Sequence, residues 1–441
     1  MRGVFQNFRS RLRRGYRRLR GYSARTVEGL SRQQTILRRL SLVGTRFVAV
    51  TGSAGKTTAA RLTHAILATR GDCHALGGRN STYASTLAVH SLPRSCKFCV
   101  QEIGAKAPGM IAEHVRVLRP DIGIVTTIGG DHYKAFRSLE ATAKEKGRLV
   151  ESLPRNGVAV LNADDPLVIA MAARTRARVL TFGLAPSADV RASAFSGIWP
   201  NRLRLTVIHS GESVDVFTLL IGEHWVPAVL AAIACGLACG LDLRACAAAL
   251  AGCGPMFGRF SEHTGAKGQV FVMDHVKAPV WTIPTGLKFV SAARAPRKTI
   301  VLGTLSDYAG AMGPRYRRTA RQALDVADRV VFAGPQSGHV ERLRKDALGD
   351  RLFNFTTAHQ ASSFLAATAM PGELIYIKAS IVDHLERIML SQLREVVCWR
   401  ERCRVQAKSC PACWRFSKPS PPPFGTQEGQ HGADRPAALD A

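Results

Sequence analysis

Residues 46–58 read Arg-Phe-Val-Ala-Val-Thr-Gly-Ser-Ala-Gly-Lys-Thr-Thr, and this stretch decides the fold. Its apolar first half is typical of a buried β-strand, its glycines mark a tight turn, and residues 57–69 read as a helix. Strand, glycine turn and helix start, in this order, suit phosphate, because glycines let backbone N–H groups approach the oxygens and the helix N-terminus adds positive potential. The alternative is a tight turn in which Gly-Lys-Thr occurs incidentally.

This loop supplies the first candidate binding residues. Lys56 would place its ammonium group on the β- and γ-phosphates, and the Thr57 hydroxyl would bind Mg²⁺. The loop is shorter than the common G-x-x-x-x-G-K-[ST] form, which indicates a particular subclass. The full candidate set is Gly52, Ser53, Ala54, Gly55, Lys56, Thr57 and Thr58.

Strand-like and helical stretches alternate along most of the chain. Such alternation predicts an α/β fold with a mainly parallel sheet covered on both faces. Residues 228–250 are rich in Ala and Leu and read as helical, with their cysteines as small core residues. A change of unit falls near residues 253–258, after which a second α/β unit is expected. The expected strands are 46–51, 99–103, 121–128, 157–162 and 177–182, then 269–274, 299–305, 329–332 and 374–378.

Two polar side chains stand at the ends of these strands. Glu102 ends the second expected strand, and His132 follows the third. Ligands collect at the carboxyl ends of parallel strands, so both side chains could reach a metal beside the phosphates. Either residue alone is more often a solvated or capping group, but the pair after a phosphate loop favours a site.

Composition sets the broad class. The 441 residues include 61 Lys and Arg against 32 Asp and Glu, with 46% hydrophobic residues, which is typical of a globular chain of about three domains. There is no apolar run of about 18 residues and no signal-peptide core, so neither a spanning helix nor export is expected. Eleven scattered cysteines are then best interpreted as reduced thiols in a cytoplasmic protein.

Residues 1–40 are strongly basic, with twelve arginines, no lysine and one acid, Glu28. Apolar residues recur at three- and four-residue steps, which on a helix gives an apolar stripe beside a cationic face, as in interfacial membrane helices. An anionic membrane surface is therefore one predicted partner. A solvated basic tail and an organelle-targeting segment stay open as alternatives, and nucleic acid is the partner we expect least. The apolar residues are Phe5, Phe8, Leu12, Tyr16 and Leu19.

The ordered motifs resemble those of the Mur ligases, ATP-dependent amide-forming enzymes of the peptidoglycan pathway, over roughly residues 46–390. The branch that adds a D-alanyl-D-alanine dipeptide is the most similar. The resemblance implies a phosphate-loop, mainly parallel sheet domain followed by a smaller Rossmann-like α/β domain. It also suggests the divisions 1–45, 46–255, 256–397 and 398–441. The matching segments are residues 52–58, 102–105, 126–132, 145–147, 160–165, 258–259, 274–279 and 378–380.

The resemblance also implies a set of metal ligands. Thr57 and Glu102 would hold one Mg²⁺ ion. His132 would help to hold a second, together with Lys146 carrying a carbamate. Without the resemblance, Lys146 would be read as an ordinary solvated lysine.

Further roles follow from the same resemblance. Lys56 would hold the ATP phosphates, and Asn80 would lie near an acyl phosphate. Arg259 and Asp274 would reach the nucleotide when the last domain closes. A carboxylate would attack the γ-phosphate of ATP, and an amine would then displace phosphate from the activated carbonyl.

The chain departs from the family pattern at several positions. The amino-terminal domain that holds a UDP-sugar is not found before the loop, and Trp225 and Ala228 replace two asparagines near the adenine. Lys277 replaces a His or Asn, Thr127 an Asn, and Arg148 an acid. The acceptor is therefore expected to be a small-molecule or lipid-linked carboxylate. The alternatives are a ligase for a non-peptidoglycan polyamide or cofactor, and a catalytically degenerate, membrane-docked nucleotide-binding subunit.

A tail follows residue 397. It is rich in proline near residues 417–424, and disorder is expected there. Four thiolates form a complete tetrahedral zinc set, so structural zinc is one prediction, and free thiols are the alternative because the spacing is irregular. The four residues are Cys398, Cys403, Cys410 and Cys413.

Overall fold

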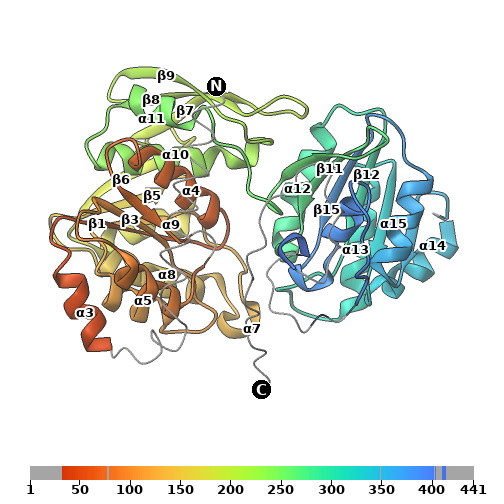
Figure 1. Cartoon of the computed structure of the whole chain (residues 1–441), viewed down its shortest axis with the longest axis horizontal. Coiled ribbons are helices and arrows are strands. Elements are labelled where there is room, and N and C mark those ends of the chain that lie inside the picture. The colour runs from red at the N-terminus through yellow and green to blue at the C-terminus, as the bar shows by residue number, and fades with distance from the viewer. Residues whose placement is uncertain (1–31, 77–78, 348, 402, 404–409, 414–441) are drawn as a thin grey trace, which may run out of the picture.

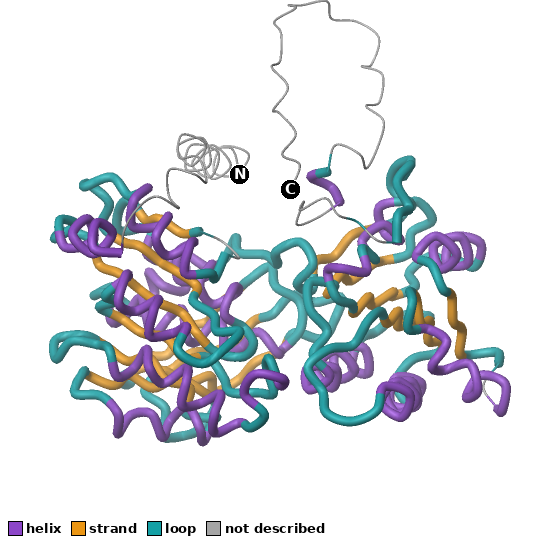
Figure 2. The backbone as a smooth tube through the Cα atoms, turned by 90° about the horizontal axis from the view of Figure 1, so that it is seen from below, coloured by secondary structure: helices purple, strands orange, loops and turns teal. Residues whose placement is uncertain are grey.

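The computed structural model describes residues 32–76, 79–347, 349–401, 403 and 410–413. Over these residues the chain forms two sheets in two lobes, which Figures 1 and 2 show side by side. The predicted α/β fold class is confirmed. We call the lobe with strands β1–β9 the first lobe and the lobe with strands β10–β15 the second lobe.

The first sheet runs parallel from β2 through β7 and ends in an antiparallel meander. Short polar strands around the turn at Ser210-Gly211 form this meander, which the sequence reading did not predict. In the described part of the chain, the strand order is β2 (Cys73–Ala75), β3 (Phe98–Glu102), β1 (Arg46–Thr51), β4 (Ile122–Val125), β5 (Val158–Asn162), β6 (Arg178–Gly183), β7 (Val190–Ser196), β8 (Arg204–His209) and β9 (Glu212–Phe217).

Side chains of β1 alternate between two cores. Val48 and Val50 pack with α4, α10 and α11 on one face, whereas Phe47 and Ala49 pack with α5, α6 and α8 on the other. A strand buried on both faces explains the uninterrupted apolar run in the sequence. The helices of this lobe are α3 (Arg32–Leu40), α4 (Lys56–Leu67), α5 (Thr82–Ser91), α6 (Met110–Leu118), α7 (Tyr133–Phe136), α8 (Leu139–Glu151), α9 (Pro166–Ile169), α10 (Val226–Ala238) and α11 (Leu243–Leu250).

The helical reading of residues 228–250 is wrong in one respect, because the structure has two helices there. Gly240 adopts a φ of 83°, and the Asp242 side chain accepts a hydrogen bond from the Ala245 N–H at 2.7 Å. A glycine in the left-handed region ends α10, and an aspartate N-cap starts α11. Cys235 and Cys246 are buried among apolar residues, as predicted.

The second lobe is smaller and mostly parallel, with β10 antiparallel to β11 at one edge. Over the described residues its strand order is β10 (Ser261–Thr264), β11 (Val270–Asp274), β15 (Leu374–Lys378), β12 (Lys298–Leu302), β13 (Arg329–Ala333) and β14 (Leu352–Phe355). Its helices are α12 (Ile283–Ala292), α13 (Met312–Leu324), α14 (Glu341–Ala347), α15 (Ala358–Ala367) and α16 (Glu386–Leu390).

Helix α3 is the described part of the predicted basic arm, of which residues 1–31 lie outside the described residues. Its Arg39 is buried, donates to the backbone oxygens of Leu118 and Arg119, and pairs with Asp121 at 3.3 Å. This arginine therefore anchors α3 to the first lobe. Leu37 and Leu40 are exposed on the same helix.

Candidate active site

The turn after β1 is held by the end of β4. A Cβ on Gly52 would lie 1.9 Å from Thr126 Oγ1, and the φ of Gly52 is 141°, so this position requires glycine. The Thr126 hydroxyl donates to the Ala54 oxygen at 2.6 Å, and the Ser53 N–H donates to the Thr127 oxygen at 2.7 Å. These hydrogen bonds fix the conformation of the loop.

Helix α4 starts directly from this turn. Gly55 is its N-cap with a φ of 77°, and it has no side chain to cap the first N–H groups. The helix N-terminus therefore presents backbone donors and positive potential to an anion. Lys56 is the first helical residue; it is buried, and its ammonium donates to the Gly52 oxygen at 2.6 Å.

Glu102 joins this loop from the neighbouring strand. Parallel pairing sets Val50 of β1 opposite Glu102 of β3, so the carboxylate reaches the same sheet edge. The Thr57 hydroxyl donates to Glu102 Oε2 at 2.7 Å, and the Asn80 amide donates to Oε1 at 3.0 Å. A hydroxyl beside a carboxylate is the hard oxygen set that Mg²⁺ prefers.

Asp131 is the electrostatic centre of the site. Its buried carboxylate lies 4.0 Å from the Lys56 ammonium, 3.8 Å from that of Lys146 and 3.8 Å from that of Lys277. Burial works to raise the pKa of Asp131, but the cations, Lys56 foremost, outweigh it and hold this pKa below its usual value. Such a group of cations around one carboxylate suits the binding of polyanions.

Lys146 is almost completely buried in helix α8. Burial first, and the charge of Lys56 second, lower the pKa of its amine to about 7. A substantial fraction of the amine is therefore neutral near pH 7, and a neutral amine is nucleophilic. Burial also lowers the pKa of Lys56, an effect that Asp131 opposes.

His132 follows Asp131 at the start of α7 and has a φ of 51°. Its Nε2 lies 3.5 Å from Asp131 Oδ1, and burial lowers the pKa of its imidazole despite that carboxylate. A cavity of about 160 Å³ lies beside these residues, lined in part by Tyr133, Phe136 and Arg137.

The two lobes meet at this site. Lys277, from the loop after β11, reaches Asp131 across the gap between the sheets. The indole of Trp281 lies against Gly129, where a Cβ would meet it at 2.6 Å. Arg259 is half-buried, and its charge contributes to lowering the pKa of Lys56.

Asp274 lies apart from this cluster. Lys378 pairs with its carboxylate at 2.6 Å, and the Tyr376 hydroxyl donates to it at 3.0 Å. The structure therefore brings Lys56, Thr57, Asn80, Glu102, His132 and Lys146 into one site with Lys277, whereas Asp274 is held within the second lobe.

The sequence reading gave no role to Asp131 or Asp165. The Asp165 carboxylate accepts from the Thr127 hydroxyl at 2.8 Å and from the Ile128 N–H at 2.7 Å, which fixes the loop that carries Asp131. The available signal was the position of each aspartate at the end of an expected strand.

The substituted positions near the expected adenine site are packed with aromatic side chains. Trp225 is buried, and the ring of its neighbour His224 lies 4.7 Å from it and 4.0 Å from Phe260. Burial lowers the pKa of His224 to about 3. Ala228 is buried in α10.

The structure does not bring the four thiols of the predicted zinc set together. In the described part of the chain, which contains all four cysteines, the group close enough to share a metal is His384, Glu386 and Cys410. Cys410 packs into the second lobe, where Arg387 donates to its sulfur at 3.1 Å. The remaining predicted ligands, which do not belong to this group, are Cys398, Cys403 and Cys413.

Comparison with known proteins agrees with the geometry. The profile of the Mur ligase middle domain matches residues 50–236. UDP-N-acetylmuramoyl-tripeptide–D-alanyl-D-alanine ligase of Mycobacterium tuberculosis is 30% identical over 384 residues, which cover 82% of this chain and 75% of that protein. This chain belongs to the Mur ligase family. The predicted family and enzyme class, an ATP-dependent ligase, are thereby confirmed.

Solved structures support the same fold. MurF from Acinetobacter baumannii aligns with a TM-score of 0.75 at 21% identity, covering 82% of this chain and 80% of that one. MurF ligase from Thermotoga maritima, in complex with ADP, aligns with a TM-score of 0.70 at 20% identity, covering 82% and 83%. Within the described residues, the helices are too short or too polar to cross a membrane.

Proposed function

We propose that this Mur ligase family member uses ATP to join a carboxylate to an amine through an acyl phosphate. The observation that carries the proposal is the group of Lys56, Lys146 and Lys277 around the buried carboxylate of Asp131, beside the phosphate loop. Bringing an anionic acceptor to ATP requires this concentration of positive charge.

Magnesium is the expected partner of the nucleotide. The Thr57 hydroxyl and the Glu102 carboxylate fit one ion, and His132 with a carbamate on Lys146 would fit a second. When bound, these ions neutralise charge on the phosphates. Lys56 and the backbone donors of the Gly52–Gly55 turn orient the phosphates.

Carbamylation of Lys146 is part of the proposal. The neutral amine attacks CO₂, a C–N bond forms, and one proton leaves to solvent, so that a neutral group becomes an anionic carbamate. The lowered pKa of the amine favours this step. The two remaining lysines then balance the new negative charge.

The reaction follows in two steps. An acceptor carboxylate oxygen attacks the γ-phosphorus of ATP, the bond to the β-phosphate oxygen breaks, and ADP leaves. The amine then attacks the acyl carbon, the C–O bond to phosphate breaks, and the amine loses a proton. We place Asn80 beside the acyl phosphate. Arg259 and Asp274 would serve the nucleotide from the second lobe once that lobe closes on the first.

The substrates are proposed from the relatives. Their names specify a UDP-N-acetylmuramoyl tripeptide and D-alanyl-D-alanine. A lipid-linked acceptor stays our alternative, because the basic stretch 1–40 suits an anionic membrane and the described helix α3 exposes Leu37 and Leu40. Equal sedimentation with anionic liposomes, with and without residues 1–40, would remove the membrane part of the proposal.

The deciding experiment measures ADP release from MgATP with the tripeptide and dipeptide named above, each alone and together. Release that requires both substrates, and that Lys56→Met abolishes, supports a ligase. MgATP binding without turnover for any carboxylate–amine pair would instead support the degenerate nucleotide-binding subunit.

A further inference from the structure

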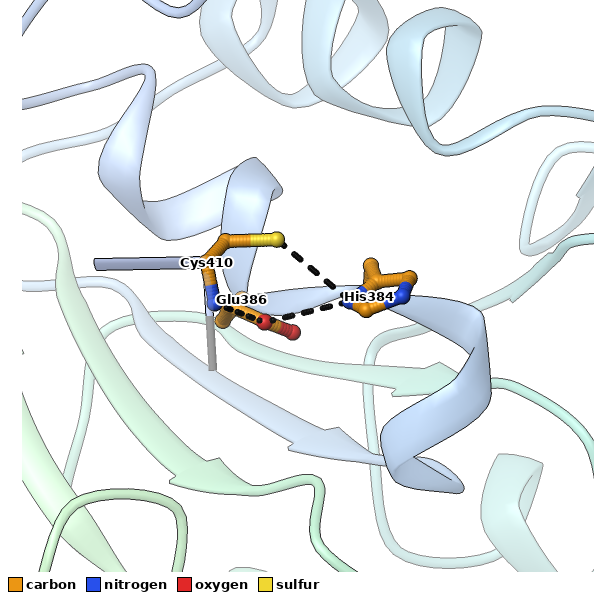
Figure 3. Close-up of side chains that lie close together, drawn as sticks. All are labelled: His384, Glu386 and Cys410. Atoms are coloured by element: carbon orange, nitrogen blue, oxygen red, sulfur yellow. Dashed lines mark hydrogen bonds and ion pairs between the residues drawn. The ribbon is translucent and has the colours of Figure 1, made fainter. Parts of the chain in front are cut away.

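A second cluster of chemically reactive side chains lies in the second lobe, away from the phosphate loop. His384 Nδ1 lies 3.4 Å from Cys410 Sγ and 3.5 Å from Glu386 Oε1 (Figure 3). All three residues are buried, with exposed fractions of 8%, 4% and 0%. Their ligand atoms lie within 4.8 Å of one another.

The chain supplies these ligands from two places. After β15, a short turn at Ile381–Asp383 leads into His384, whose φ of 52° lies in the left-handed region, and α16 starts at Glu386. Cys410 lies 24 residues after Glu386 in the sequence, and its N–H donates to Glu386 Oε1 at 3.0 Å. A non-glycine residue at positive φ is uncommon, and here it aims the imidazole at the sulfur.

The polar atoms of the cluster are incompletely satisfied. Glu386 Oε2 is buried and has no hydrogen-bond partner, and its contact with His275 Nε2 at 3.7 Å is too long for a hydrogen bond. An unpaired carboxylate oxygen in a buried site is costly. The oxygen that faces His384 is Oε1, so a cation in the cluster would satisfy Oε2 only by binding both oxygens of the carboxylate.

The sulfur of Cys410 has one charged donor, Arg387, whereas burial raises the pKa of this thiol to about 12. The guanidinium of Arg387 is buried, donates through Nε to Cys410 Sγ at 3.1 Å, and donates through its terminal nitrogen to the Arg400 oxygen at 2.7 Å. A charged donor directed at sulfur is strongest when the sulfur is a thiolate, which is the form that binds metals.

We propose that His384, Glu386 and Cys410 bind one Zn²⁺ ion, which fastens residues 410–413 to the second lobe. Nitrogen, oxygen and sulfur are the ligand atoms that zinc takes, at bond lengths of about 2.0–2.3 Å. At tetrahedral angles these lengths place neighbouring ligand atoms about 3.3–3.7 Å apart, which agrees with both distances from His384. One water molecule completes the tetrahedral shell.

This site does not depend on the proposed ligase chemistry. Its three ligands lie outside the phosphate loop and outside the group around Asp131, so each proposal can fail alone. We therefore assign the ion a structural role and expect metal content to be independent of nucleotide.

The test uses the full chain, purified without chelator. We expect about one zinc per chain by elemental analysis, and, after exchange with Co²⁺, a sulfur-to-cobalt charge-transfer band in the near ultraviolet. Cys410→Ser should lose that band, and His384→Ala should weaken Co²⁺ binding at least tenfold. Cys413→Ser, three residues away, is the matched control and should keep both zinc and the band.

Three results would overturn the proposal. The first is a folded wild-type chain that holds no zinc and gives no cobalt band. The second is a Cys410→Ser variant that keeps the band. The third is loss of the band in Cys398→Ser and Cys413→Ser as well, which would restore the four-thiol set. Because the wild-type measurement needs no variant, a misfolded substitution cannot hide the answer.

Discussion

The phosphate-loop site and the His384 cluster differ in how the chain assembles them. The first is built at one sheet edge, where the register of parallel strands places Glu102 beside the loop after β1. The second joins a turn in the second lobe to Cys410, with no shared strand pairing to fix its partner. Sites on neighbouring strands can therefore be predicted from sequence far better than a site that takes one of its ligands from the carboxy-terminal segment.

The two regions also differ in charge. Asp131 gathers three lysines, an arrangement that binds anions but concentrates like charge. The His384 cluster holds a carboxylate, a thiol and an imidazole, a set suited to a cation. Substitutions of the buried lysines in the first region should therefore change activity more than stability, and substitutions in the second region should do the reverse.

The largest effect is expected at Lys56. Lys56→Met keeps the methylene packing and removes the ammonium, so ligation should fall about 10³-fold, as when a preorganised charge donor is lost. The melting temperature should not fall, because a desolvated cation is removed. Steady-state kinetics and calorimetry measure the two quantities. Lys144→Met, on the exposed face of α8, is the control, and an equal loss of activity there would contradict the assignment.

A loss of about 10²-fold is expected for Lys146→Met, because the carbamate cannot form. In the wild type, activity should rise as pH increases through about 7, since the neutral amine reacts with CO₂. A ¹³C carbamate signal from the wild type grown or exchanged in ¹³C-bicarbonate, absent from the variant, is the direct readout. A wild-type chain without that signal under activity conditions would contradict carbamylation.

Burial of Lys146 should make the free energy of unfolding of the wild type decrease as the pH falls. A lysine whose pKa is raised by an ion pair has the opposite effect. The folded-state pKa of Lys146 lies below its unfolded value near 10.5, so protonation opposes folding. This opposition is absent above a pH of about 10.5, grows as the pH falls from about 10.5 to about 7, and is constant below that. Lys146→Met should therefore gain stability relative to the wild type as the pH decreases through that window.

Asp131→Asn should lower turnover by a smaller factor, about tenfold. The free energy of unfolding should fall by about 3 kcal/mol, because the buried lysines lose the carboxylate that pairs with them. Asp131 raises the pKa of Lys146, so its removal should shift the rising limb of the pH–activity profile to lower pH. A profile that does not move would show that Asp131 is not coupled to this amine. Asp164→Asn, in the loop after β5, is a matched control for the profile.

The sequence predicted much of the first site for physical reasons. Lys56, Thr57 and Glu102 follow from local motifs, because strand ends and a helix start fix their positions. Asp131 lies in the matching segment 126–132, but its role is not evident from the sequence, since two of its three lysine partners come from α8 and from the second lobe. The contact between Lys277 and Asp131 depends on lobe packing, which local periodicity does not encode.

Metal removal should give the smallest effect on activity and tests the second region. A chelator should lower the melting temperature of the wild type by about 5 °C, because an ion held at 100 times its dissociation constant stabilises by about 2.7 kcal/mol. Ligation, assayed after MgCl₂ is restored, should stay within about twofold. Cys410→Ser should show no chelator-dependent shift, whereas Cys413→Ser should shift as the wild type does. If chelation instead abolished ligation without changing the melting temperature, zinc would take part in the ligase reaction. The structural role that we assign to the ion, and with it the contrast between the two regions, would then be wrong.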